Sequence, residues 1–228
     1  MECRVCGKQV SLTDDTLLHR TRLTLPDWFS AAWMVATTNG LSSVKMARQL
    51  GINQKGAYAL LARLRQAMAR SLTNSLSNVV EADEAFFGRK EHQLVVEVLA
   101  EARDNGRVRM ATVSGQNAAI LIPFIMNRVE AGTTIRTDGW KSYNGLAAAG
   151  LTHERIVHLP GWIERGERST PYADEAISAT KHWLLATYNK PPTPENLDAY
   201  LAEFCFRREY RYPGAAFEAL LRGLVTPR

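Results

Sequence analysis

Three aspartates and one lysine occupy positions in this chain that could support metal-dependent chemistry. Asp83 interrupts an apolar, strand-like run, and Asp138 ends a second such run directly before a glycine. Asp174 opens an amphipathic helical pattern, and Lys181 follows it by seven residues. Carboxylates from separate elements can converge on two divalent cations, which stabilise the attacking and leaving oxygens of an in-line phosphodiester displacement. The pattern favours cutting or joining of nucleic acid, with two Mg²⁺ or Mn²⁺ ions as cofactors.

The two strand-like runs place their acids where a cation could compensate them. Alternation puts Glu81 and Asp83 on one face of the first strand and Glu84 on the other. A strand this apolar is expected to be central, so an ionised Asp83 needs a partner such as a metal ion. Asp138 falls at the C-terminal end of its strand, where ligand sites of open α/β sheets gather. The structural alternative places Asp83 in a turn and makes Asp138 a helix cap.

The third acid belongs to a helix that also carries the lysine. Residues seven apart lie about 20° from alignment on a helix, so Asp174 and Lys181 share a face. Glu175 points about 100° away and is the weaker candidate for third ligand. Lys181 would then hold a DNA phosphate near the metals. The structural alternative is that Asp174 is an ordinary acid at a helix N-terminus, where the helix dipole favours it.

Length and composition exclude several classes of protein. The chain has 228 residues, with 46% hydrophobic and 22% charged residues, as in a soluble globular protein. Its longest apolar run, 118–126, contains a proline and is too short to span a bilayer. The first residues lack the apolar core of a signal peptide, so we expect a cytoplasmic protein without membrane partners.

Positive charge is concentrated in the first third of the chain. Residues 1–78 carry 10 Lys and Arg against 4 Asp and Glu, and 41–70 contains six basic residues and no acid. This balance is typical of a surface that binds a phosphate backbone, although a solvated helical face is the simpler alternative. The same segment predicts two helices joined by a turn at 51–53, as in a helix-turn-helix, with an ordinary helical hairpin as the alternative. The predicted DNA contacts are Lys45, Arg48, Asn53, Gln54, Lys55, Tyr58 and Arg63.

The cysteines do not form a complete metal site. Cys3 and Cys6 have the spacing of one zinc knuckle, but a structural zinc site needs four protein ligands and no second cysteine pair follows. His19 is only a distant substitute. The sequence therefore favours two free thiols, or the remnant of a zinc ribbon, over bound Zn²⁺. Residues 1–24 are interpreted as such a remnant.

The order of predicted elements indicates the fold class. Residues 25–72 predict the helical helix-turn-helix region, and a polar linker at 71–78 predicts a boundary before a domain of 73–228. Three strands at hairpin spacing (79–88, 93–102 and 107–114) precede a helix at 117–129, a strand at 133–138, a short helix at 143–149 and a strand at 154–158. A loop at 159–170 and helices at 172–188, 194–210 and 213–224 follow. This order is that of an α/β, RNase H-like mixed sheet flanked by helices.

Several segments together resemble one family of mobile-element enzymes. They are VEADEAFFG at 80–88, TDGWKSYNGL at 137–146, and KHWLLATY at 181–188 followed by YLAEFCFR at 200–207. The chain resembles, over nearly its whole length, the acidic-triad (DDE-type) insertion-sequence transposases of the zinc-ribbon, ISXO2-like kind. The third acidic position of that family, which tolerates Glu, Asn or His, falls on Asp174, although the residues around it differ from the usual pattern.

The resemblance implies a bacterial or archaeal protein with an RNase H-like catalytic domain and a dependence on Mg²⁺. It implies binding of double-stranded DNA at terminal inverted repeats and at a target, with cleavage of element ends and strand transfer. We expect a homo-oligomer when it acts on DNA and association with the nucleoid. The alternative is a truncated or repurposed, catalytically inactive DNA-binding protein, which the single cysteine pair favours. An RNA-directed nuclease on the same fold gains nothing from a helix-turn-helix.

Overall fold

The computed structural model describes residues 6–7, 11, 13–88, 91, 93–156, 170–188 and 192–227. The chain divides into two compact units, one of residues 1–72 with 210–228 and the other of residues 73–209. Most of the loop predicted at 159–170, and the end of the strand predicted at 154–158, lie outside the described residues. Among the helices of the described residues, none combines the length and apolar character needed to cross a membrane.

The first unit is helical, and polar caps define where its N-terminal helices begin. Thr24 and Asp27 form a reciprocal capping box at the start of the first helix, and the Ser42 hydroxyl accepts from the backbone N–H of Lys45 at the start of the second. The Asn53 side chain does the same for Gly56 at the third, at 2.7 Å. The four helices are α1 (Leu25–Thr37), α2 (Ser43–Leu50), α3 (Gln54–Ser71) and α7 (Pro213–Val225).

A tight turn joins α2 to α3, as the sequence predicts. Gly51 has the left-handed conformation (φ 65°, ψ 25°), and the N–H of Ile52 donates to the carbonyl of Ala47 at 3.1 Å. These bonds satisfy carbonyls that the end of α2 would otherwise leave unpaired. The apolar residues of α3, including Leu60, Leu61 and Leu64, are buried.

The C-terminal helix α7 belongs to this first unit, whereas the sequence analysis assigns it to the domain of 73–228. It packs on α1 and α3. Gly223 lies so close to α3 that an added Cβ would be 2.2 Å from the carbonyl oxygen of Ala67. The Ser71 hydroxyl donates to the Ala219 carbonyl at 2.8 Å. An amphipathic helix does not specify its partner by itself; small residues that permit this close approach do.

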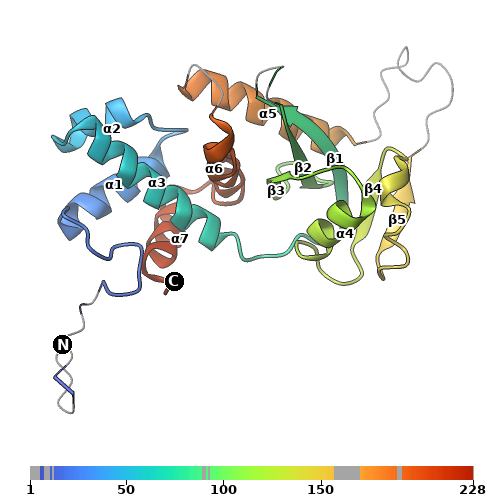
Figure 1. Ribbon diagram of the computed structural model, residues 1–228, viewed down its shortest axis with the longest axis horizontal. Coiled ribbons are helices and arrows are strands. Elements are labelled where there is room, and N and C mark those ends of the chain that lie inside the picture. The colour runs from blue at the N-terminus through green and yellow to red at the C-terminus, as the bar shows by residue number, and fades with distance from the viewer. Residues whose placement is uncertain are drawn as a thin grey trace. The chain divides into compact units, whose positions relative to one another are not determined.

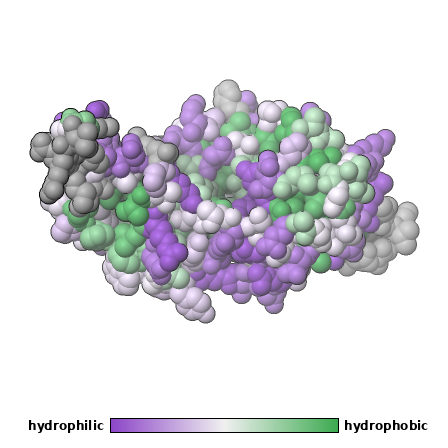
Figure 2. Space-filling view, turned by 90° about the horizontal axis from the view of Figure 1, so that it is seen from below, coloured by the Kyte–Doolittle hydropathy of each residue, from purple (hydrophilic) through white to green (hydrophobic). Residues whose placement is uncertain are grey.

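Helix α1 buries one face and exposes apolar residues on the other. Its buried residues are Trp28, Ala31, Ala32 and Val35. Phe29 and Trp33 are about half exposed, at 47% and 50%. Exposed apolar residues are common on folded proteins. Figure 2 shows hydrophobic and hydrophilic residues interspersed over one face of the molecule.

The second unit is built on a mixed five-stranded sheet with the order β3-β2-β1-β4-β5 (Figure 1). β1 pairs antiparallel with β2 and parallel with β4, β2 pairs antiparallel with β3, and β4 pairs parallel with β5. The strands are β1 (Val79–Phe87), β2 (Leu94–Glu101), β3 (Val108–Val113), β4 (Thr134–Thr137) and β5 (Thr152–Arg155). This topology confirms the RNase H-like α/β fold with N-terminal helices that the order of elements predicts.

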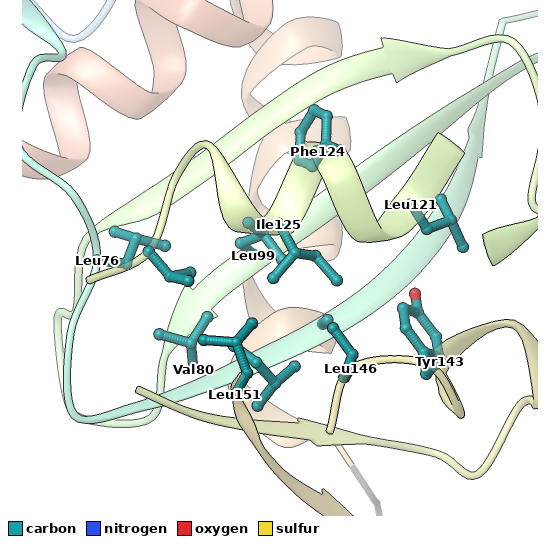
Figure 3. Close-up of a cluster of buried hydrophobic side chains, with 12 residues drawn as sticks. Leu76, Val80, Leu99, Leu121, Phe124, Ile125, Tyr143, Leu146 and Leu151 are labelled. Carbon is teal, nitrogen blue, oxygen red and sulfur yellow. The ribbon is translucent and has the colours of Figure 1, made fainter. Parts of the chain in front are cut away.

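Helices cover both faces of this sheet. Figure 3 shows one face, where Val80 and Leu99 of the sheet pack against Leu121 and Ile125 of α4 (Ala118–Met126). On the opposite face, α5 (Pro171–Tyr188) packs on β1 and β2, and α6 (Leu197–Glu209) packs on β3. β1 is therefore a central strand with helices on both sides.

Element bounds differ from the predictions mainly around short elements. The helix predicted at 143–149 is a 3₁₀ turn, η2 (Lys141–Tyr143), followed by further turns. The strand predicted at 154–158 begins two residues earlier, at Thr152. The helix predicted from Pro194 starts with a 3₁₀ turn, η3 (Pro194–Asn196), and continues as α6.

Replacement of Gly223 by alanine tests the close packing of α7 on α3. The added methyl would collide with backbone atoms, which cannot move aside as a flexible side chain can, so we expect a loss of about 2 kcal/mol in the free energy of unfolding. Gly214→Ala in the same helix is the matched control, because its Cβ meets nothing within 4 Å. That variant should be neutral or slightly stabilising. Urea denaturation measures both, and equal stabilities would contradict the packing described.

Candidate functional site

Strand β1 separates its acidic residues between the two faces of the sheet, as alternation predicts. Val80 and Ala82 belong to the apolar core beneath α4. Glu81 and Asp83 face the other way and contact the start of α5. Glu84 returns to the α4 face. Glu81 is buried beneath its helical layer, whereas Asp83 and Glu84 are half-buried.

Asp83 is held in a defined orientation and carries a perturbed carboxyl group. Its Oδ1 accepts from the backbone N–H of Glu84 at 2.8 Å, and its Oδ2 accepts from the Thr170 hydroxyl at 3.2 Å. Burial raises the pKa of Asp83 to about 6, and the negative charges of Asp138 and Asp174 add to this rise. The structure therefore brings Asp138 and Asp174 within electrostatic reach of Asp83.

Asp138 follows the last residue of β4 and is exposed. Its Oδ1 accepts from the backbone N–H of Trp140 at 3.0 Å, which fixes the turn after the strand. Gly139 has φ 92°, and a Cβ at this position would lie 2.8 Å from Nε of Arg155. Glycine thus permits both the turn and the approach of a guanidinium beside Asp138. The sequence analysis does not single out Arg155, because only the pairing of β4 with β5 brings it there.

Asp174, rather than Glu175, acts electrostatically on Asp83. Asp174 lies in the first turn of α5, where its backbone N–H donates to the carbonyl of Thr170 at 2.9 Å. Its charge contributes to the raised pKa of Asp83. Glu175 is exposed and forms an ion pair with Arg208 of α6, with Nη1 donating to Oε1 at 3.0 Å. This arrangement agrees with the angular separation of about 100° between successive helical residues.

Lys181 lies two helical turns beyond Asp174 and is exposed. Its Nζ is 5.3 Å from the centre of the Phe87 ring at the end of β1. Helix α5 thus runs along β1, with Asp174 near Asp83 and Lys181 near Phe87. Seven residues of helix span about 10 Å, which separates the lysine from the acids by roughly one or two nucleotides of backbone.

A second group of acids lies beneath Asp83 on the α4 face. Glu84 and Glu97 are paired across β1 and β2, and the hydroxyl of Tyr143, labelled in Figure 3, donates to Glu97 at 3.2 Å. Burial raises the pKa of Glu84 to about 7 and that of Glu97 well above its usual range. Oε1 of Glu84 is buried without a hydrogen-bond partner in the described part of the chain. Burial therefore favours the protonated form of both groups.

Two residues missed as site candidates link Asp83 to α5. Glu81 accepts from the backbone N–H groups of Tyr172 and Ala173, and Thr170 contacts Asp83 directly. The signal for Glu81 was available, because alternation places it on the same face as Asp83. The signal for Thr170 was not, since its role depends on where α5 begins.

The three aspartates are not a ready-made metal cluster. Among the described residues, no group of three or more His, Cys, Asp or Glu side chains is placed so that it could hold a metal ion. The chemistry of the donor set nevertheless suits Mg²⁺, which is commonly held by one or two carboxylates together with waters and substrate phosphates. The mutual repulsion seen in the raised pKa of Asp83 is what a divalent cation would relieve. The chemistry of the residues present is therefore compatible with divalent cations.

The predicted DNA contacts in the first unit fall into two groups. Five are exposed on α2 and α3: Lys45, Arg48, Gln54, Lys55 and Tyr58. The other two make hydrogen bonds within the unit. Asn53 caps α3, and Nη1 of Arg63 donates to the carbonyls of Leu17 and His19 at 3.2 and 3.4 Å.

The predicted cysteine pair lies partly outside the described residues. Cys3 lies outside the described residues, whereas Cys6 is exposed with a free thiol. Nδ1 of His19 lies 3.0 Å from Oδ1 of Asp14, so this imidazole already has a polar partner.

The fold and the three acids define an RNase H-like protein with an acidic site on one face of its sheet. A family model described as the ISXO2-like transposase domain matches residues 75–209, and the chain belongs to this family. One similar solved structure is the HTLV-2 integrase catalytic core domain in complex with magnesium, in a trimeric form. It shares 14% identity, covers 58% of this chain and 85% of its own, and has a TM-score of 0.38.

A second similar structure is a chain of the simian T-cell lymphotropic virus intasome in complex with PP2A regulatory subunit B56 gamma. It has 15% identity and a TM-score of 0.36, and the match covers 75% of this chain and 66% of that one. None of the curated proteins matches the chain.

Replacement of Asp83 by asparagine should alter how stability depends on pH. Because the folded-state pKa of Asp83 is raised to about 6, the folded state binds a proton more tightly than the unfolded state. Stability is therefore lost as pH rises from about 4 to about 6. Without metal, Asp83→Asn should match the wild type near pH 4 and exceed it by roughly 2 kcal/mol above pH 7.

Glu101→Gln is the control of opposite sign. Burial opposes ionisation of Glu101, but hydrogen bonds from Arg107 and Arg103 outweigh it and lower its pKa to about 2. The stabilising contribution of ionised Glu101 is present above pH 4.5 and is lost as pH falls toward 2. The free energy of unfolding of the variant should therefore be lower than that of the wild type at pH 7. Urea denaturation across pH measures both variants. A difference in stability between Asp83→Asn and the wild type that does not change with pH would contradict the raised pKa of Asp83.

Proposed function

We propose that this protein is a DNA transposase that cleaves the ends of an insertion sequence and transfers them to target DNA. The observation that supports the proposal is that the charges of Asp138, after a strand end, and Asp174, on a helix, both act on Asp83 within a transposase-family domain. We further propose that it acts on double-stranded DNA as a homo-oligomer in the prokaryotic cytoplasm, associated with the nucleoid.

We assign the binding of divalent cations to the same three aspartates. Asp83 is the central ligand, because the charges of the other two both act on it. When bound, a pair of such cations stabilises the charge that develops on the attacking and leaving oxygens of phosphodiester displacement. The absence of a preformed three-residue cluster in the described residues is compatible with this assignment, since substrate phosphates complete the coordination of Mg²⁺ in many enzymes.

The chain's own side chains orient the DNA and the acids. Thr170 and the backbone N–H of Glu84 each engage one oxygen of Asp83, so its carboxylate cannot rotate freely. Lys181 offers a fixed positive charge along the same helix face as Asp174. A phosphate next to the scissile one would meet this ammonium, which positions the strand without taking part in the proton transfers.

Cleavage assays with terminal-repeat DNA test the assignment of the acids. In Mg²⁺ or Mn²⁺ the wild type should nick or join its own terminal repeats. Asp83→Asn and Asp174→Asn should lower the rate at least about 100-fold, since each removes a ligand worth several kcal/mol in the transition state. DNA binding, measured without metal, should remain intact.

Glu175→Gln is the matched control for Asp174→Asn, because it neutralises the adjacent acid that pairs with Arg208. This control should keep near-wild-type cleavage. Cleavage that survives in Asp83→Asn would refute the site, and equal losses in the two helix variants would refute the choice of Asp174.

We propose that helices α2 and α3 bind DNA, with α3 presenting Gln54, Lys55 and Tyr58 to a major groove. The support is the exposed, acid-free basic surface and the tight turn between the two helices. Asn53 and Arg63 contribute less directly, because both already make hydrogen bonds within the unit. Lys45 and Arg48 on α2 are placed to contact phosphates.

The salt dependence of DNA binding tests this surface. If Arg48 and Lys55 each neutralise one phosphate, replacing both with alanine should reduce the slope of log K against log salt by roughly 2. Arg222→Ala is the control, since this exposed side chain pairs with Glu218 on α7. An unchanged slope in the double variant, measured by fluorescence anisotropy, would remove α2 and α3 from the interface.

The alternative function is a DNA-binding protein that does not cut. Steeply salt-dependent binding without metal-dependent cleavage, even at high protein concentration, would favour this alternative over transposition. An RNA-directed nuclease would cleave an RNA–DNA hybrid in preference to double-stranded DNA. Comparing cleavage of the two substrates therefore separates it from the transposase and from the non-cutting DNA-binding protein.

A further inference from the structure

Glu81 is a buried carboxylate whose partners come from two other elements. Its side chain is 0% exposed. Oε2 accepts from the backbone N–H groups of Tyr172 at 2.6 Å and Ala173 at 3.1 Å. Oε1 accepts from Nη1 of Arg136 at 3.4 Å. Both oxygens are therefore engaged within the protein, so Glu81 does not contact DNA.

The contacts of Glu81 with α5 fix the first turn of that helix. The first N–H groups of a helix have no partner within the helix. Pro171 has none to offer, Glu81 satisfies those of Tyr172 and Ala173, and the carbonyl of Thr170 satisfies that of Asp174. The residue that directly follows this clamp is Asp174. The position of Asp174 relative to β1 is therefore set by a side chain of β1 itself.

The contact with Arg136 extends the same link to β4. Glu81 and Arg136 are opposite each other in the parallel pairing of β1 with β4. Each lies two residues before a proposed metal ligand, Asp83 or Asp138. Arg136 also contacts Glu154 of β5, with Nη2 3.1 Å from Oε2. Glu81 lies on β1 itself, and its side chain contacts α5 and Arg136 of β4. It thus links the three elements that carry or precede the acids.

We propose that Glu81 is a positioning residue that sets the spacing of Asp83, Asp138 and Asp174, and this inference rests on the proposed function. A buried carboxylate is unfavourable unless it is fully hydrogen-bonded, so its presence beside the acids calls for a role. A merely structural carboxylate would stabilise the sheet without affecting how the acids bind cations. Glu101 is such a case, since it is 2% exposed and binds Arg103 and Arg107 at the β2–β3 turn.

Hydrogen exchange in the full chain, without metal or DNA, tests the link to α5. Glu81→Ala should speed exchange of the Tyr172 and Ala173 amides about tenfold, since each loses its acceptor. Glu81→Gln, which keeps one carbonyl acceptor, should show a smaller effect. Glu101→Gln should leave these amides unchanged. Exchange at Tyr172 and Ala173 that is the same in all four proteins would overturn the proposal.

Metal dependence tests the consequence for the acids. The Mn²⁺ concentration for half-maximal cleavage of terminal-repeat DNA should rise about 10-fold to 100-fold in Glu81→Ala and less in Glu81→Gln. Glu101→Gln should keep the wild-type value even where it lowers stability. Faster exchange combined with an unchanged Mn²⁺ requirement would reduce Glu81 to a structural role and overturn the proposal.

The two proposals fail in distinguishable ways. A wild type that binds DNA but does not cleave it would refute the proposed function. In that case, a second readout replaces cleavage. It is the shift in the thermal midpoint of unfolding when Mn²⁺ is added to the metal-free protein. A shift that is smaller in Glu81→Ala than in Glu101→Gln supports positioning, and equal shifts overturn it.

Discussion

The second unit depends on how one central strand accommodates acidic side chains. β1 lies in the middle of the sheet, with α4 on one face and α5 on the other, yet it carries Glu81, Asp83 and Glu84. Buried carboxylates are unfavourable unless they are hydrogen-bonded, paired or protonated. The sheet uses a different solution for each of the three. Glu81 accepts hydrogen bonds from a helix N-terminus, Glu84 has a pKa raised to about 7, and Asp83 accepts two hydrogen bonds while burial and the charges of Asp138 and Asp174 raise its pKa to about 6. A divalent cation would relieve the repulsion that acts on Asp83.

The two faces of β1 therefore have different electrostatic roles. On the α4 face, Tyr143 donates to Glu97, and burial favours the neutral forms of Glu97 and Glu84. If both were ionised, their charges would act through the strand on Asp83. On the α5 face, the helix N-terminus offers N–H donors, and helix dipoles favour negative charge at this end. The α5 face thus offers helix N–H donors to ionised carboxylates, whereas burial on the α4 face favours neutral ones.

Much of this arrangement follows from local sequence. Strand alternation places Glu81 and Asp83 together, and the helical angle distinguishes Asp174 from Glu175. The order of strands and helices also indicates the fold class. Other features depend on contacts that a local pattern does not contain. Glu97 joins Glu84 through strand register, Asn53 is used as a cap, and α7 packs with α1 and α3 because Gly223 permits close contact with Ala67. An amphipathic helix predicts that a partner exists, but tertiary contacts decide which one.

The choice of aspartate at the third position is consistent with this geometry. Aspartate reaches one methylene less far than glutamate, so a helix that carries it must lie closer to the strand opposite. Glu81 contacts the α5 backbone directly, at the two residues before Asp174. Thr170, at the start of α5, donates to Asp83. The longer glutamate at residue 81 thus spans the distance between strand and helix, and the charge of the shorter Asp174 acts on Asp83.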